Sequence, residues 1–510
     1  MTDSTAGAVG ATPPAAVMQG FDTFSASGRA TAIAGDTNVI GAHDRCDYTV
    51  CTSTETLTNA LNISASVSAE FGFGGFDAKS EFVRKLETTS TSVVVAIYAS
   101  VVSGTTVVTN PRLAAGITPP DAAGLNAFFQ AYGDSYLSAI THGGEYIATY
   151  TFYSQTRAEQ QSIVASLQAH GVTTSGTVSA GVTTAISQVA SSETVRVSFS
   201  QQLFGFSGVP LPAQDQIVPF ALGLSGRTPN TPTVVKYDTE GYEHAPGMNA
   251  DVWRPVIETR DLFASHEKGS GIAAAVDALE AMLSQTTWLR GVYGAYGYTL
   301  DAQLKTRAAD IDKDASTLKA FIRTMQKDPT KSYTRPALPS LAYGLPVLNV
   351  TTPAVAFQWG GDGGDAWWDV SMQTILDSAP LRQVAMEGVA YLDRITCTYG
   401  NATTIGHGGN GGKPVQPLVL EPGELISALG GRSWAYVDQL SITTTRGQQR
   451  ACGGGGGDPR SWMLPPPSGA QYTVVVGFAG RAARYVDAIG AMTSTFSPAT
   501  WQGESSLEAP

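Results

Sequence analysis

Residues 477–490 read GFAGRAARYVDAIG, and they contain one copy of a motif that occurs three times in the chain. The copies are Tyr391-Leu-Asp393, Tyr436-Val-Asp438 and Tyr485-Val-Asp487, at intervals of 45 and 49 residues. Glycine runs recur with nearly the same period, as Gly360–Gly364, Gly408–Gly412 and Gly453–Gly457. Two independent motifs with one period predict three copies of a single structural unit. The glycine-rich composition from about Phe357 to Met492 predicts that this unit is all-β.

This region resembles the jacalin-related lectins, which are type I β-prisms built from three four-stranded sheets. The last loop of that family reads Gly-x-x-x-Asp, and here Ala483 takes the glycine position while Asp487 is kept. A Tyr-x-Asp in all three units resembles family members in which each unit binds one sugar. The resemblance implies carbohydrate contacts at Gly363, Gly364, Tyr391, Asp393, Gly411, Gly412, Tyr436, Asp438, Ala483, Arg484, Tyr485 and Asp487.

The chemistry of these residue types suits a sugar. A carboxylate accepts hydrogen bonds from two neighbouring hydroxyls, and glycine lets backbone N–H groups approach a ligand closely. The alternative is that each Asp caps a turn and each Tyr packs in the core of the prism. Several weak sites on one molecule would gain avidity on a glycan-covered surface.

In the N-terminal half, residues 61–86 alternate between apolar and polar side chains on both sides of Gly74-Gly75. Strict alternation predicts a strand with one apolar face, and a Gly-Gly pair predicts a tight hairpin turn. In this pairing Glu70 lies opposite Lys79, and each arm is long enough to cross a bilayer. The apolar face that we expect to enter the membrane comprises Ile63, Val67, Phe71, Phe73, Phe76 and Phe82.

A second alternating segment contains Val178, Val182 and Ile186, which we also expect to enter the membrane, and it continues through Val197 and Phe199. Before it, Thr156-Arg-Ala-Glu159 has the pattern of a capping box that opens a helix. The alternative for both alternating segments is a pair of ordinary half-buried strands.

Tyr132-Gly-Asp-Ser-Tyr136, followed by Gly143-Gly144, resembles the signature of the membrane-attack-complex/perforin (MACPF) family. That signature is usually Tyr-Gly-Thr-His-Phe/Tyr with a later Gly-Gly, so Asp134 and Ser135 depart from it. The resemblance implies a bent antiparallel central sheet flanked by helical clusters over residues 17–330, with Gly143 and Gly144 as a hinge. It also implies that segments 52–86 and 156–200 are mostly helical in the soluble monomer. On a membrane they would unfurl, and a ring of monomers would close a β-barrel.

The overall composition restricts the partners. The net charge of −12 argues against nucleic acid and against docking onto anionic lipid by charge alone. The N-terminus lacks the features of a signal peptide, so we expect a soluble protein that is released and then reaches a target membrane. The four cysteines form no disulfide scaffold or zinc motif, although a local Cys46–Cys51 bridge and a Cys397–Cys452 bridge within one domain stay open. No metal or catalytic motif includes a histidine, and His407 is expected in a loop, so we predict no enzyme activity and no cofactor.

The chain is therefore predicted to be an α+β protein, a MACPF domain followed by an all-β prism. The expected parts are a tail at 1–16, a pore-forming domain at 17–330, a proline-rich linker at 331–355, a lectin domain at 356–495 and a tail at 496–510. Helical spacing predicts two helices within 272–322. The predicted function is a pore-forming toxin that binds target-cell glycans and is insecticidal by analogy. The alternative is a non-lytic carbohydrate-binding or adhesion protein.

Overall fold

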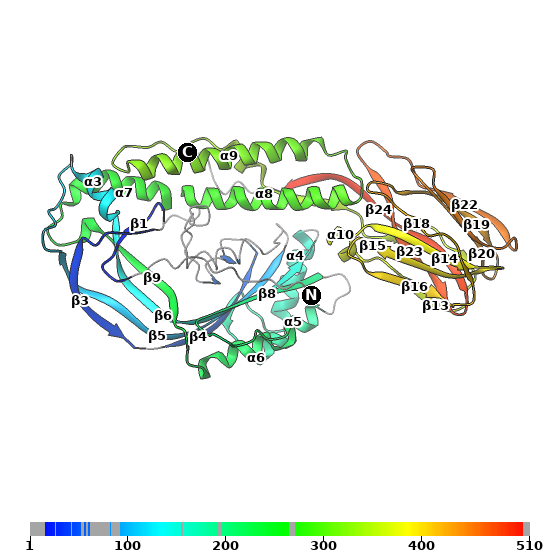
Figure 1. Ribbon diagram of the computed structural model, residues 1–510, viewed down its shortest axis with the longest axis horizontal. Coiled ribbons are helices and arrows are strands. Elements are labelled where there is room, and N and C mark those ends of the chain that lie inside the picture. The colour runs from blue at the N-terminus through cyan, green and yellow to red at the C-terminus, as the bar shows by residue number, and fades with distance from the viewer. Residues whose placement is uncertain are drawn as a thin grey trace. The chain divides into compact units, whose positions relative to one another are not determined.

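The computed structural model describes residues 16–25, 27–41, 43–52, 56–57, 60–61, 82, 92–154, 157–190, 196–264 and 271–502. The chain divides into two compact units (Figure 1). Unit 1 comprises residues 1–283, 310–345 and 502–510, and unit 2 comprises residues 284–309 and 346–501. Among the helices of these ranges, none is long and apolar enough to cross a membrane.

Unit 1 is organised around two long neighbouring strands, β5 (Val93–Leu113) and β6 (Ser135–Tyr153). Their β-branched and aromatic residues favour extended backbone and fill a buried sheet. Strand β5 pairs with β4 (Asp44–Cys51) and β3 (Ile33–Ile40), and β6 pairs with β8 (Arg196–Phe204) and β9 (Thr233–Gly241). The sheet is antiparallel and curved (Figure 1). Short strands extend it: β1 (Gly20–Asp22), β2 (Ser27–Arg29) and β7 (Ser175–Thr177).

Helices of unit 1 pack on this sheet, so the mixed α+β class is confirmed. They are α3 (Leu125–Tyr132), α4 (Arg157–Ala169), α5 (Ala180–Ala190), α6 (Ile217–Leu222) and α7 (Ala250–Ala264). Single turns of 3-10 helix lie at Gln214–Gln216, Leu224–Gly226, Tyr242–His244 and Pro339–Tyr343. The two helices predicted from spacing are α8 (Ile272–Ala295) and α9 (Ala302–Lys327), and each contributes residues to both units.

The strand predicted at Val178–Ile186 is wrong for most of its length, because α5 begins at Ala180. Val182 and Ile186 are buried, together with Val189, and these positions lie on one face of a helix. A spacing of four residues satisfies both helical and strand periods, which is why alternation misled the prediction. Helix α4 begins at Arg157, where the capping box predicted a helix, although Thr156 itself lies outside the described residues. Strand β8 contains Val197 and Phe199.

Of the first alternating segment, Ile63, Val67, Phe71, Phe73 and Phe76 lie outside the described residues, as does the expected tail up to Ala15. Phe82 is described, and it is buried in a cluster with Leu57, Leu61, Val94, Ala96, Tyr98 and Ile147.

The four cysteines are free thiols. Cys46 and Cys51 lie on one strand, five positions apart. Their side chains therefore point to opposite faces of the sheet, which rules out the local bridge.

Unit 2 contains three antiparallel sheets, as the lectin resemblance implies. Each is centred on a hairpin: β14 (Leu381–Gly388) with β15 (Leu392–Tyr399), β19 (Ile426–Ser433) with β20 (Val437–Thr444), and β23 (Tyr472–Ala482) with β24 (Val486–Gln502). The outer strands are β10 (Leu345–Val350), β11 (Ala354–Val355), β12 (Trp359–Gly360), β13 (Asp365–Trp368), β16 (Thr404–Gly408), β17 (Lys413–Pro414), β18 (Leu418–Val419), β21 (Gln449–Gly453) and β22 (Asp458–Met463). A short helix, α10 (Met372–Leu376), completes the unit.

Unit 2 extends beyond the range expected for a lectin domain. Strands β10 and β11, in the expected linker, pair with β24, and β24 itself runs through the expected tail. Phe496 is fully buried, and its ring stacks on Tyr296, the residue after α8, at a centroid distance of 5.2 Å. Leu289, Val292 and Tyr293 of the same helix belong to this core. The C-terminal turns of α8 are thus part of the packing of unit 2.

Candidate functional site

Three equivalent turns join the central hairpins of unit 2. They are Val389-Ala390-Tyr391, Trp434-Ala435-Tyr436 and Ala483-Arg484-Tyr485. In each turn, the N–H of the first residue donates to the carbonyl of the tyrosine, at 3.2, 3.0 and 3.0 Å. Each turn also follows a β-bulge at the same register. The sequence repeat thus produces a repeated local geometry.

The glycine runs lie against these turns, and each run contacts the turn of a different sheet. A Cβ atom built on Gly361 would lie 2.5 Å from the carbonyl oxygen of Ala435. The equivalent distances are 2.4 Å from Gly409 to Arg484 and 2.7 Å from Gly454 to Ala390. Only glycine permits such an approach of two backbones. The three runs and the three turns therefore gather at one end of the prism.

The three motif tyrosines meet at this end. Their ring centroids are 5.3 Å apart for Tyr391–Tyr436 and for Tyr391–Tyr485, and 5.7 Å apart for Tyr436–Tyr485. The tyrosines therefore pack mainly on one another. This packing is close to the alternative given above, in which each tyrosine stabilises the prism, although Tyr436 is partly exposed. Arg484 places its guanidinium 5.5 Å from the ring centre of Tyr485.

The aspartates face the glycines of their own sheets and define three sites. The first site contains Gly363, Gly364 and Asp487, and the third contains Gly456, Gly457 and Asp438. The second contains Gly411 and Asp393, whereas the predicted Gly412 packs against the backbone of Gly388. In the third site, Cβ atoms on Gly456 and Gly457 would each lie 2.3 Å from a carboxylate oxygen of Asp438. Only glycine therefore fits beside the carboxylate at these two positions.

The carboxylates themselves are largely buried. Asp487 is only 5% exposed, and its Oδ2 has no hydrogen-bond partner in the described part of the chain. A buried acceptor without a partner is costly, so a ligand that donates a hydrogen bond to it would be stabilised.

The glycines of the first two sites were predicted from the sequence, whereas Gly456 and Gly457 of the third site were not. The third glycine run at the repeat interval was the signal that points to them. Which run faces which aspartate depends on strand pairing, since β12 places Gly360 beside Ala488 of β24.

Two of the three loops are clamped by an arginine. Arg432 donates from Nε to the carbonyl of Gly456 and from Nη2 to that of Gly457, at 2.7 and 2.6 Å. Arg481 makes the same pair of bonds to Gly363 and Gly364, at 3.0 and 2.7 Å. In the remaining sheet, Glu387 occupies the position that corresponds in register to Arg432 and Arg481. Its carboxylate cannot donate hydrogen bonds to the carbonyls of the glycine loop. The second site therefore lacks this clamp.

His407 lies in strand β16, not in the loop that the sequence predicted. Its Nε2 is 2.7 Å from Oδ1 of Asp369, and its ring stacks on Trp367 with centroids 3.8 Å apart. Tyr399 donates to the other oxygen of Asp369 at 3.2 Å. Burial raises the pKa of the Asp369 carboxyl above its ordinary value, although the contact with His407 lowers it. His407 and Asp369 therefore form a pair that stabilises the interior of the prism.

In unit 1, Gly143 and Gly144 lie where β6 changes its partner strand from β9 to β8. A Cβ atom on Gly143 would lie 2.2 Å from the carbonyl oxygen of Val101, and one on Gly144 would lie 2.2 Å from the ring of Phe206. The glycines are thus required by close packing at this point of the sheet. Their role as a hinge stays a prediction.

The signature residues before β6 support a buried polar network. Gly133 has a φ of +83°, and Tyr136 donates to Glu240 at 2.7 Å. Asp134 accepts hydrogen bonds from the N–H and the hydroxyl of Thr23, both at 2.7 Å, and lies 3.5 Å from Arg260. Burial raises the pKa of the Asp134 carboxyl to about 6.

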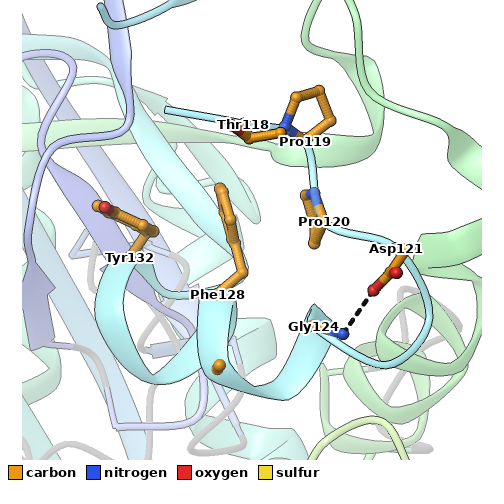
Figure 2. A pocket seen from close by; sticks show the side chains of 8 residues that line it. Thr118, Pro119, Pro120, Asp121, Gly124, Phe128 and Tyr132 are labelled. Carbon is orange, nitrogen blue, oxygen red and sulfur yellow. Dashed lines mark hydrogen bonds between the residues drawn. The ribbon is translucent and has the colours of Figure 1, made fainter. Parts of the chain in front are cut away.

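A pocket of about 440 Å³ lies beside the remaining signature residue, Tyr132 (Figure 2). The rings of Phe128 and Tyr132 project from α3, and Asp121 accepts a hydrogen bond from the N–H of Gly124 at 2.8 Å. The carboxylate is therefore used locally at the start of the helix. The lining residues are Thr118, Pro119, Pro120, Asp121, Gly124, Ala127, Phe128 and Tyr132.

Comparison with known proteins agrees with the geometry of unit 2. Residues 357–492 match the family model of the jacalin-like lectin domain. No curated protein matches the chain.

Similar solved structures cover 28% of this chain. They include Malaysian banana lectin (26% identity, 97% of that chain, TM-score 0.23) and artocarpin in complex with mannopentose (20%, 98%, 0.24). A mannose-binding jacalin-related lectin from Ananas comosus is 23% identical over 96% of its chain, with a TM-score of 0.23. From the family match and the three repeated sheets, residues 357–492 are a jacalin-like lectin domain.

Proposed function

We propose that the protein binds target-cell glycans through the three sites of its lectin domain. The observation that supports this proposal is the close approach of glycine backbones to the buried carboxylates of Asp393, Asp438 and Asp487, which repeats in all three sheets. Carboxylates that are held in place and accept hydrogen bonds from paired hydroxyls suit the edge of a sugar ring. Three sites at one end of the prism favour multivalent binding to a surface rich in glycans.

The test is binding of the full chain to a glycan array. Replacing all three aspartates by asparagine removes the charge and keeps the side-chain volume. We expect this triple variant to lose array binding by more than tenfold, because hydrogen bonds to a charged acceptor are among the stronger ones. Asp312→Asn, at an exposed position of α9, is the matched control. Equal binding by the triple variant and the wild type would refute the proposal.

We propose further that unit 1 forms pores after the lectin domain has bound. The resemblance to the MACPF signature supports this, and so does the composition of α5. Five of the eleven residues of α5 are β-branched, and one is glycine. Such residues form helices poorly, so packing on the sheet maintains α5. Released from that packing, the same residues favour a strand.

In this proposal, residues 156–200 leave the sheet as a unit and become a hairpin in a ring of monomers. Closure of the ring into a barrel satisfies the backbone hydrogen bonds that lipid cannot. Segment 52–86 would supply the second hairpin, as the resemblance implies.

A disulfide between β4 and β7 tests this step. Thr49 and Ser175 are directly opposite each other in the ladder, at a spacing that suits a disulfide. The double variant Thr49→Cys/Ser175→Cys, when oxidised, would tie the α4–β7–α5 segment to the sheet. We expect dye leakage from susceptible cells to stop, surface binding to persist, and reduction to restore leakage. The single-cysteine variants are the controls.

The alternative function is a non-lytic lectin or adhesion protein. It predicts binding to the same cells without leakage by the wild-type protein. Leakage that continues with the β4–β7 disulfide closed would contradict the proposed movement of residues 156–200.

A further inference from the structure

We infer that the three sugar sites are unequal, that the third site dominates, and that Trp434 is the residue that determines its affinity by stacking on the sugar. This inference rests on the proposed glycan binding, and it concerns differences among three positions that the repeat makes equivalent. The differences lie in the first residue of each turn, in the arginine clamp and in the middle of each glycine run.

The first residue of the turn is the most divergent of these positions. It is Val389 in the second site, Trp434 in the third and Ala483 in the first. Trp434 is 77% exposed, against 58% for Val389. An indole at such an exposure contributes little to the core, whereas it offers a flat apolar surface to a ligand.

Trp434 is adjacent to the third site through the backbone. A Cβ atom on Gly457 would lie 2.7 Å from the carbonyl carbon of Ser433, the residue that precedes Trp434. The same Cβ would lie 2.3 Å from Oδ2 of Asp438. A pyranose that donates its hydroxyls to Asp438 therefore sits beside the turn that carries the indole, and the ring's C–H bonds provide the apolar face for contact.

The clamp separates the third site from the second. Arg432 holds both carbonyls of Gly456 and Gly457, and Glu387 stands at the equivalent position of the second site. A loop held in its binding conformation loses less entropy when a ligand binds. The second site is therefore expected to be the weakest of the three.

The glycine run separates the third site from the first. The central residue of the run is Asp362 in the first site, Asn410 in the second and Gly455 in the third. A Cβ atom on Gly455 would meet nothing within 4 Å. No side chain therefore covers the backbone at the middle of the third loop. The first site has an arginine clamp like the third, but its turn begins with an alanine where the third has Trp434.

The test uses the full chain and three probes, the methyl α-pyranosides of mannose, glucose and galactose, titrated by calorimetry. With the best probe, Asp438→Asn should remove the tightest binding event. Asp487→Asn should change that event by less than threefold, and so should Asp393→Asn. Equal losses from the three single variants would overturn the inference.

Variants of the tryptophan test its role separately. We expect Trp434→Ala to weaken the tightest binding roughly tenfold, as loss of one aromatic contact implies. Trp434→Phe should retain affinity within threefold, and Trp368→Ala, at another exposed tryptophan of unit 2, should match the wild type. Unchanged affinity in Trp434→Ala would overturn the inference while the proposed function stands. Failure of the triple aspartate variant to lose array binding would instead remove the proposed function itself.

Discussion

Replacing Gly456 by alanine should disable the third site without harming the fold. The new Cβ would lie 2.3 Å from Oδ1 of Asp438, whereas an ordinary contact begins near 3.4 Å. The other close atoms belong to the same side chain, with Cγ at 3.1 Å. Gly456 does not have a positive φ, so the alanine adds no backbone strain. The carboxylate must therefore move by about 1 Å.

A shift of that size lengthens the hydrogen bonds from the sugar hydroxyls to Asp438, about 2.8 Å long, beyond the usual donor–acceptor distance. Two bonds to a charged acceptor contribute about 1.5 kcal/mol each at the lower limit, so the loss is about 3 kcal/mol. Affinity at this site should fall roughly 100-fold. The free energy of unfolding should stay within about 1 kcal/mol of the wild type, because removing a glycine also restricts the unfolded chain.

The matched control is Gly455→Ala, one residue earlier in the same run, where the new Cβ meets nothing within 4 Å. Calorimetric titration of both variants with the best methyl pyranoside gives the affinity, and thermal melting gives the change in stability. Wild-type affinity in Gly456→Ala, or an equal loss of affinity in Gly455→Ala, would refute this prediction.

Three further predictions concern stability. Phe496→Ala should destabilise unit 2 by about 3–5 kcal/mol in a urea titration, because the ring is fully buried; a loss below 1 kcal/mol would show that residues after 495 are dispensable. His407→Ala should cost about 2–4 kcal/mol by the same measurement, since it leaves the Asp369 carboxylate buried without its closest partner; stability equal to the wild type would contradict this. Asp134 has a folded-state pKa of about 6, above the ordinary 3.8, so its proton stabilises the fold and this contribution is lost as the pH rises through that window. Asp134→Asn should therefore flatten the change in unfolding free energy between pH 4 and pH 7, by up to about 3 kcal/mol, and an unaltered pH profile would disprove the assignment.

Local periodicity predicted some elements of unit 1 and failed for others. Helices α8 and α9 follow from apolar residues at helical spacing over long segments. At Val182 and Ile186 the same kind of pattern suggested a strand, since a spacing of four residues fits both structures. The segment forms α5 because, as a helix, it buries both side chains against the sheet.

The limits of unit 2 were also beyond local pattern. Prolines between 329 and 353 suggested a linker, but Pro346 lies in a strand that pairs with β24. The end of α8 joins the same core through Tyr296 and Phe496. Contacts between residues so distant in sequence leave no signal in a short window.

The sequence by itself determined that unit 2 has three similar parts, because each part repeats its own turn and glycine run within 45 to 49 residues. Local backbone chemistry is enough for that, since glycine and turn residues act within a few positions. Only the tertiary structure decided which glycines face which aspartate, that the three tyrosines meet, and that His407 is paired inside the prism. These relations arise from strand pairing and burial, which bring together residues that the chain itself holds far apart.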